Sequence, residues 1–308
     1  MRTVAAILLL SQVAPASGDS PVIPYLETRL SHQESAKILT HGPWPPPPRR
    51  DPSNGVSGKR EAIALGKRLF FEPRLSGTGS VLCATCHVPY RAFQDGRPRA
   101  FGVAGTERNT PTLLDVAFYP RFGWEGARDT LWSQSIRPLL EEREMRSSPS
   151  HVAEFIRTHA ARDYEKAFGR PPPADDEQTL LDVGRALAAY QETLVSARTP
   201  FDTFRDALAR DDDAGMGGYP LAAQRGLRVF IGSCAGCHAG PAFSNGSIVR
   251  GFRVPGLRGV ALTAPYMHDG SAASLREAAL HASPKLEREG LDDLVVFLQS
   301  LTEAGEPK

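Results

Sequence analysis

Two runs of five residues, at 83–87 and 234–238, constrain this chain more than any other feature. Each run has the spacing C-x-x-C-H, and together they hold all four cysteines of the 308-residue sequence, Cys83, Cys86, Cys234 and Cys237. The spacing is typical of covalent haem attachment, because two thiols three positions apart can bond the two vinyl groups of one porphyrin while the next imidazole reaches the iron. We therefore expect two c-type haems, with His87 and His238 as their proximal iron ligands.

Three other interpretations of the cysteines stay open from the motifs alone. A zinc site would take four Cys or Cys/His ligands from two C-x-x-C halves, but it does not need the histidine that directly follows each half. A thioredoxin-type redox pair would need one motif in a βαβ context. Simple disulfides would leave both histidines unexplained.

The first residues predict export from the cytoplasm. Residues 1–3 give a charged start, residues 4–10 a short apolar run, and residues 14–18 small side chains suited to cleavage. This pattern indicates a secretory signal peptide over residues 1–18, and the apolar run is too short to span a bilayer. An ordinary buried N-terminal helix is the alternative. No later run approaches 18 apolar residues, so we expect a periplasmic protein that is not embedded in a membrane.

Length and charge limit the classes of function. A chain of this length, with one haem motif in each half, is expected to form two domains. Its formal net charge is +1, and it has no long block of like charge and no basic stripe with interleaved aromatic residues. A nucleic-acid partner is therefore not expected.

Apolar periodicity predicts a mainly α fold with a duplicated unit. A helix over 62–70 precedes the first haem motif and a helix over 222–230 precedes the second, which predicts two cytochrome c-like haem domains. Further helices are predicted over 131–140, 152–168, 179–195, 201–209, 274–282 and 291–301. The break at 169–173 places the boundary between an N-terminal domain of residues 19–170 and a C-terminal domain of residues 171–308.

Several ordered motifs beyond the haem runs are also present. They are R-N-T-P-T-L at 108–113, W-E-G at 124–126, Gln134, the pair Glu144-Met145, and T-A-P-Y-M-H-D-G-S at 263–271. With these motifs in this order, the chain resembles the di-haem bacterial cytochrome c peroxidase and MauG family over nearly all of its mature sequence. The resemblance implies a peroxide-reactive haem in the N-terminal domain and an electron-relay haem in the C-terminal domain.

The resemblance also implies three catalytic residues. Glu144 matches the family's distal carboxylate and Gln134 its pocket glutamine. Peroxide must lose a proton from the oxygen that binds iron and gain one on the oxygen that leaves, so one carboxylate can serve both steps. An apolar haem pocket would raise the pKa of such a glutamate towards the working range. Trp124 matches a tryptophan between the haems, where an aromatic ring can relay electrons.

Four further residues match positions between the two domains of the family. Asn109, Thr263 and Pro265 match an inter-domain calcium site, and their side-chain and backbone oxygens are donors that suit calcium. His268 matches a histidine near the haem propionates. The resemblance therefore implies a bound Ca²⁺ and a bridging His268 that is not an iron ligand.

Two departures from the family pattern concern the iron ligands. Members that need reductive activation carry a loop histidine that caps the peroxidatic haem, but no histidine lies between residues 88 and 109, and Phe101 is about where it would fall. The first haem is therefore expected to be five-coordinate. The family takes the sixth ligand of the second haem from the position of Ala282. We expect neighbouring His281 to replace it, with Met267 as the alternative.

The resemblance as a whole implies a periplasmic oxidoreductase of the MauG-like branch. Hydrogen peroxide would form a high-valent haem state that oxidises a residue of a protein partner. One alternative is a cytochrome c peroxidase that reduces peroxide to water with electrons from a small redox protein. Another is a di-haem electron carrier without a reaction of its own, but Glu144, Gln134 and the missing histidine argue against it, because a carrier gains nothing from an open iron site.

Overall fold

The computed structural model describes residues 30–283 and 286–303, so the predicted signal peptide at 1–18 lies outside the described residues. Within them the chain is mainly helical, as predicted. The α-helices are α1 (His32–Leu39), α2 (Arg60–Phe70), α3 (Cys83–Cys86), α4 (Leu131–Leu140), α5 (Pro149–Phe155), α6 (Ala161–Phe168), α7 (Asp176–Gln191), α8 (Pro200–Leu208), α9 (Asp213–Gly217), α10 (Leu221–Ser233), α11 (Leu275–Ala282) and α12 (Arg288–Gln299). Strands β1 (Ile248–Val249) and β2 (Phe252–Arg253) form a short antiparallel hairpin, in which Ile248 pairs with Arg253.

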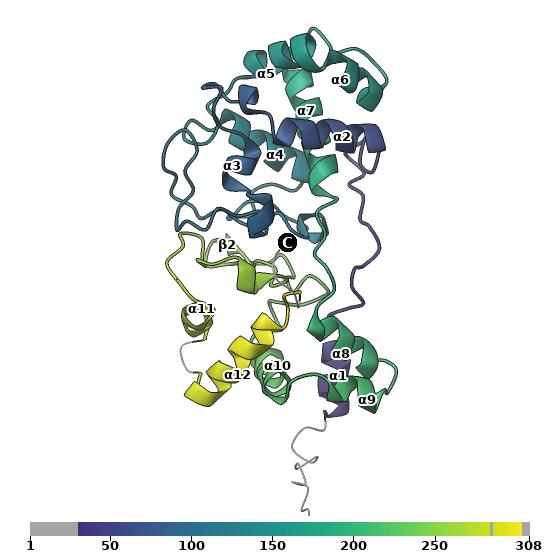
Figure 1. Ribbon diagram of the computed structural model, residues 1–308, viewed down its shortest axis with the longest axis vertical. Helices are drawn as coiled ribbons and strands as arrows, with labels where there is room; N and C mark the ends of the chain where they lie inside the picture. The colour runs from purple at the N-terminus through teal and green to yellow at the C-terminus, as the bar shows by residue number, and fades with distance from the viewer. Residues whose placement is uncertain (1–29, 284–285, 304–308) are drawn as a thin grey trace, which may run out of the picture.

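The helices form two lobes stacked along the long axis of the molecule (Figure 1). The first lobe contains α2 to α7, and the second contains α8 to α12 together with α1. Each lobe has its own core, which includes Phe70 and Tyr164 in the first lobe and Phe230 and Phe297 in the second. No helix among the described residues is long and apolar enough to cross a membrane.

Each lobe is built on a close crossing of two helices at a glycine. α2 crosses α7 in the first lobe, and α10 crosses α12 in the second. A Cβ atom on Gly66 of α2 would lie 1.9 Å from the carbonyl oxygen of Ala186, and a Cβ atom on Gly226 of α10 would lie 1.9 Å from that of Asp293. Only glycine allows these approaches, so the helix that leads into each haem motif is held against the last long helix of its lobe.

Two helices pack in the other lobe from the one that the predicted boundary at residue 170 assigns to them. α7, which follows that boundary, buries residues from Leu180 to Tyr190 in the first core. α1, which precedes it, packs on α8 and α10 and buries Ile38 in the second core. The prolines after Gly169 end α6, because proline cannot continue a helix, but the chain then returns to the same lobe. It crosses to the second lobe in the segment between α7 and α8.

The segment between α1 and α2 runs back along the outside of the molecule, beside the α7–α8 segment (Figure 1). Trp44 joins the two: its Nε1 donates to the carbonyl oxygen of Ser196 at 3.0 Å, and its own carbonyl oxygen accepts from Arg198 at 2.9 Å. The two lobes are therefore linked by two neighbouring segments of chain, α1–α2 and α7–α8.

Candidate haem and peroxide site

His87 and His238 are oriented in the same way in the two lobes. Nδ1 of His87 lies 3.1 Å from the carbonyl oxygen of Phe93, and Nδ1 of His238 lies 3.1 Å from that of Phe243. Both phenylalanines have a positive φ, 58° and 55°, which is uncommon outside glycine. Donation from Nδ1 selects the tautomer whose Nε2 lone pair is free for a metal. Burial lowers the pKa of both imidazoles and so favours this neutral form.

The four cysteines are free thiols, so none is used in a disulfide. Burial raises the pKa of Cys83 to about 12 and that of Cys86 to about 11. The two motifs lie in different lobes, and no group of three or more His, Cys, Asp or Glu side chains among the described residues could hold a metal ion. This arrangement does not form the shared zinc site, whereas one motif per lobe fits one covalent haem per lobe.

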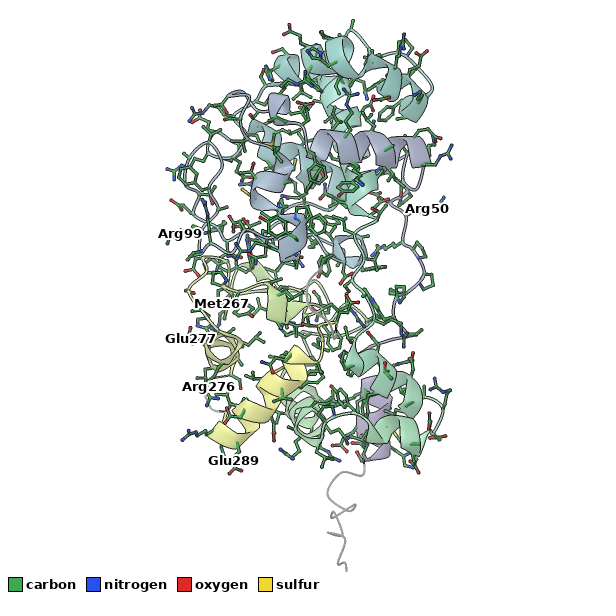
Figure 2. The ribbon with its side chains drawn as sticks, in the orientation of Figure 1. Arg50, Arg99, Met267, Arg276, Glu277 and Glu289 are labelled. Carbon is green, nitrogen blue, oxygen red and sulfur yellow. The ribbon has the colours of Figure 1, made fainter. Side chains whose placement is uncertain are left out.

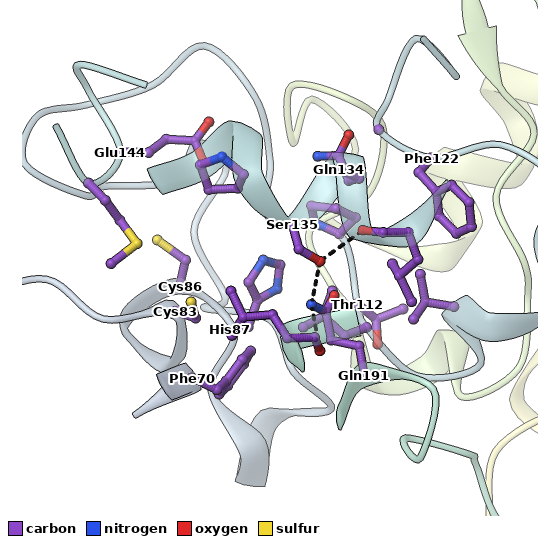
Figure 3. A pocket seen from close by; sticks show the side chains of 18 of the residues that line it. Phe70, Cys83, Cys86, His87, Thr112, Phe122, Gln134, Ser135, Glu144 and Gln191 are labelled. Atoms are coloured by element: carbon purple, nitrogen blue, oxygen red, sulfur yellow. Dashed lines mark hydrogen bonds between the residues drawn. The ribbon is translucent and has the colours of Figure 1, made fainter. Parts of the chain in front are cut away.

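A cavity adjoins the first motif (Figure 3). The empty space inside it, including the part that is open to solvent, is about 980 Å³. Cys83, Cys86 and His87 line it, and its apolar wall includes Phe70, Val81, Leu113, Leu131 and Met145. An apolar cavity next to an imidazole with a free Nε2 fits a porphyrin.

Glu144 and Gln134 both line this cavity. Figure 3 shows them along one edge of it, with Phe70 at the opposite edge. Burial raises the pKa of Glu144, as an apolar pocket should. Gln134 comes from α4, whose N-cap Thr130 accepts from the N–H of Ser133.

Arg137 is a residue that the sequence analysis missed. Its guanidinium donates to Oε1 of Glu144 at 2.9 Å, and this charge lowers the pKa of the carboxyl, against the effect of burial. The pair is half-buried, with side-chain exposures of 45% for Arg137 and 27% for Glu144. The arginine therefore holds the carboxylate at the cavity and favours its ionised form. Its seven-residue separation from Glu144 across a turn left no periodic signal in the sequence.

Phe101, at the place of the capping histidine of other family members, lies outside the cavity. Its side chain is 52% exposed and is not among those that line the cavity. The loop that carries it is bonded to the backbone beside Glu144, because Val103 donates to the carbonyl oxygen of Glu144 at 2.9 Å and Ala104 donates to that of Arg143 at 3.0 Å. Within residues 30–283 and 286–303, His87 is the one histidine that lines the cavity.

Trp124 lines the same cavity and lies at the contact between the lobes. Its Nε1 donates to the carbonyl oxygen of Asn109 at 2.8 Å, and its own carbonyl oxygen accepts from the N–H of Arg253 in β2 at 2.7 Å. The N–H of Asn109 in turn donates to the carbonyl oxygen of His268 at 2.8 Å. The predicted tryptophan thus connects the first cavity to two segments of the second lobe.

Arg253 is a second missed residue, because it reaches the first cavity from the second lobe. Its guanidinium lies 4.5 Å above the ring of Tyr119, and burial lowers its pKa. No ion pair found among the described residues includes it, and a buried cation is costly without an opposite charge. The carboxylates of a porphyrin would supply that charge, so this residue also fits a haem. Nothing in the sequence motif revealed the contact.

The residues predicted for calcium are placed as follows. Asn109 is buried and its Nδ2 donates to the carbonyl oxygen of Arg97 at 2.8 Å. Thr263 donates from Oγ1 to the carbonyl oxygen of Val260 at 3.1 Å, and Pro265 follows a cis peptide bond. Calcium binding by these residues stays a prediction.

The two predicted histidines of the second lobe have different surroundings. The ring of His268 stacks on Phe252 of the same lobe, with centroids 3.8 Å apart and planes 17° apart, and its carbonyl oxygen accepts from the N–H of Asn109 across the lobe contact. His281, near the end of α11, is exposed. Its role as an iron ligand stays a prediction.

Comparisons with known proteins identify the family of this chain. The family model described as di-haem cytochrome c peroxidase matches residues 60–210. The methylamine utilization protein MauG of Methylorubrum extorquens is 35% identical, over 78% of this chain and 78% of the relative. The cytochrome c551 peroxidase of Pseudomonas aeruginosa is 30% identical, over 77% of this chain and 78% of the relative.

Solved structures show the same fold. A MauG-like protein associated with microbial copper homeostasis has a TM-score of 0.71 and 26% identity, over 87% of this chain and 96% of that chain. The diheme peroxidase BthA of Burkholderia thailandensis has a TM-score of 0.66 and 22% identity, over 83% and 87%. With one haem motif in each lobe and Glu144 at the first cavity, the chain belongs to the di-haem cytochrome c peroxidase and MauG family of oxidoreductases, which carry two haems.

Proposed function

We propose that this protein is a periplasmic, MauG-like oxidoreductase that uses hydrogen peroxide to oxidise a residue of a protein partner. One observation carries the proposal. The cavity of the first lobe is lined by Glu144 and Gln134, His87 is the only histidine among the described residues that line it, and Phe101 lies outside it. In the part of the chain that the structure describes, no second histidine lines this cavity that could take the place of peroxide on the iron of a bound haem.

Glu144 handles the protons of the reaction. A bound haem would supply an iron that takes up peroxide. It would also hold the oxidising equivalents that are released when the O–O bond breaks. The ionised carboxylate of Glu144 accepts a proton from one peroxide oxygen and returns it to the other, which leaves as water. Arg137 holds the carboxylate in place for this task, and Gln134 offers an amide donor and acceptor in the same cavity.

Electrons must then arrive from the partner. Trp124 lies in the first cavity, and its carbonyl oxygen is bonded to Arg253 of the second lobe. Two residues further along, Pro255 contacts His238 through its carbonyl group. This short path joins the cavity to the second haem motif. A partner docked at the surface would lose two electrons, and one peroxide with two protons would become two waters.

An ordinary cytochrome c peroxidase is the second candidate. The 30% identity to the Pseudomonas aeruginosa cytochrome c551 peroxidase favours it. In that case a small redox protein would donate the two electrons, one at a time, and no partner residue would be modified.

The periplasmic location and a bound calcium ion belong to the same proposal. The charged start and apolar run of residues 1–18 support export to the periplasm. The oxygens of Asn109, Thr263 and Pro265 suit calcium between the lobes. Metal analysis of the purified protein, before and after chelation, tests the calcium assignment.

Rapid mixing with peroxide separates the two candidates. The protein with both haems attached is mixed with one equivalent of peroxide, either alone or with a reduced small c-type cytochrome. A MauG-like enzyme is expected to keep an altered absorption spectrum for many seconds when alone and to oxidise the cytochrome slowly. Fast multiple turnover with the cytochrome would refute the proposal in favour of an ordinary peroxidase. Mass spectrometry of candidate partner proteins after peroxide treatment then identifies the modified residue.

A further inference from the structure

One stretch of the first lobe recurs in the second lobe at a constant spacing along the chain. Residues from Pro111 to Leu131 correspond to residues from Pro255 to Leu275, 144 positions later (255 minus 111). The recurring features are the 3-10 turns Val116–Phe118 and Val260–Leu262, the left-handed residues Asp115 and Gly259 before them, the bridges Phe122 to Arg128 and Tyr266 to Ala272, and the helix N-caps Thr130 and Ser274. α4 and α11 are therefore equivalent helices of the two lobes.

This correspondence places Met267 at the position of Gly123. Both residues have a left-handed backbone, with φ of +78° for Gly123 and +72° for Met267. Such a conformation is uncommon for a side chain as large as methionine, and strain of this kind gathers at functional sites. Figure 2 shows Met267 in the second lobe, above Glu277 and Arg276 of α11.

In the first lobe, a side chain at this position would point toward Gln134. A Cβ atom on Gly123 would lie 3.1 Å from Oε1 of Gln134, and both residues line the first cavity. The position equivalent to Gln134 in the second lobe is Ala278. The first lobe therefore pairs a glycine with a long side chain on α4, whereas the second pairs a long side chain with an alanine on α11. Because Ala278 is small, the Met267 side chain has room in the second lobe at the place that Gln134 fills in the first.

The positions of α11 that are equivalent to the cavity-lining positions of α4 carry no metal ligand. In α4 the cavity is lined by Leu131, Gln134, Ser135 and Pro138. The equivalent residues of α11 are Leu275, Ala278, Ala279 and Ala282. His281 corresponds to Arg137, which contacts Glu144 but does not itself line the cavity, and His281 is exposed.

We propose that Met267 provides its thioether sulfur as the second axial ligand of the haem held by His238. Thioether sulfur is an established ligand of haem iron in electron-transfer cytochromes. The second haem is then closed on both faces, whereas the first stays open for peroxide. The inference rests on the proposed function, since it needs a haem in each lobe.

The test compares single variants of the protein with both haems attached. Met267→Leu keeps the apolar volume but removes the sulfur, and Met216→Leu makes the same exchange at a methionine packed against the second core. His281→Ala tests the competing ligand. Electron paramagnetic resonance and near-infrared magnetic circular dichroism of the oxidised proteins report the ligands of the low-spin haem without any measurement of activity.

The expected result is loss of the His/Met signature in Met267→Leu and its retention in Met216→Leu and His281→Ala. A signature unchanged in Met267→Leu, or lost in His281→Ala, overturns the inference. Met267→His is expected to give a bis-His signature in its place, which covers the case in which the leucine variant fails to fold. A haem count of the wild type separates failure of the proposed function from failure of the Met267 ligand. Fewer than two haems refutes the proposed function. Two haems with an unchanged Met267→Leu spectrum refute the Met267 ligand alone.

Discussion

Replacement of Arg137 by glutamine tests how the pocket keeps its proton acceptor ionised. Burial raises the pKa of Glu144, and the guanidinium of Arg137, 2.9 Å away, lowers it. Removal of the positive charge lets the pKa rise further. Because only the ionised carboxylate can take a proton from peroxide, the variant is expected to react more slowly with peroxide at acidic pH. At pH values well above the pKa of both proteins, the rates are expected to converge.

The size of the effect follows from the geometry of the pair. Two unit charges about 4 Å apart attract by roughly 4 kcal/mol at an effective dielectric constant near 20. The side chains of Arg137 and Glu144 are 45% and 27% exposed, so solvent screens the pair. We therefore expect about 1 kcal/mol, between an exposed pair and a buried one. This free energy corresponds to about a fivefold smaller ionised fraction, and so to about a fivefold lower rate, on the acidic side.

Stopped-flow measurement of the reaction with peroxide over a range of pH provides the assay. Arg146→Gln is the matched control, because Arg146 has the same charge on the same segment but its Nε donates to the carbonyl oxygen of Glu142. The acidic limb of the profile should move upward in pH for Arg137→Gln and stay in place for Arg146→Gln. A profile that Arg137→Gln leaves unchanged would refute the role given to the ion pair.

Three further variants test the rest of the account. Glu144→Gln should slow the reaction with peroxide by roughly a hundredfold or more, and stopped-flow rates close to those of the wild type would remove Glu144 from the mechanism. Gly226→Ala should destabilise the protein by about 1–3 kcal/mol in denaturant unfolding, because the new Cβ meets the backbone of α12. Gly232→Ala is the control on the same helix, because its Cβ would meet nothing within 4 Å. This control should be neutral or stabilising by up to about 1 kcal/mol. Asp202→Asn breaks the ion pair with Arg258, whose two side chains are each 1% exposed, and should cost about 3–5 kcal/mol in the same unfolding measurement; a loss below about 1 kcal/mol would contradict the buried pair.

The haem motifs and the mainly α fold were accessible from the sequence because their signals are local. C-x-x-C-H spacing and apolar periodicity each lie within one segment of chain. The placement of Glu144, Gln134 and Trp124 around one cavity needed the family resemblance, because these residues come from three separate segments. From the charge pattern alone, Glu144 is only one of a run of exposed charges.

Contacts between distant segments could not be predicted. Arg253 enters the first cavity from the second lobe, and His41 lies with its Nε2 3.1 Å from the carbonyl oxygen of His238. Neither contact leaves a periodic or compositional signal. The domain boundary at residue 170 was placed at the strongest break in the chain, but a proline run only ends a helix. Which lobe a helix joins depends on its packing partner, as α1 and α7 show.

The central claim is that each lobe holds a covalent haem and that the iron at His87 keeps one face open. Electron paramagnetic resonance of the purified, oxidised protein tests this claim most directly. The account predicts one high-spin haem, assigned to the first lobe by its loss in a His87→Gly variant, and one low-spin haem in the second. A spectrum in which both haems are low-spin, with a protein ligand on each face, would contradict it.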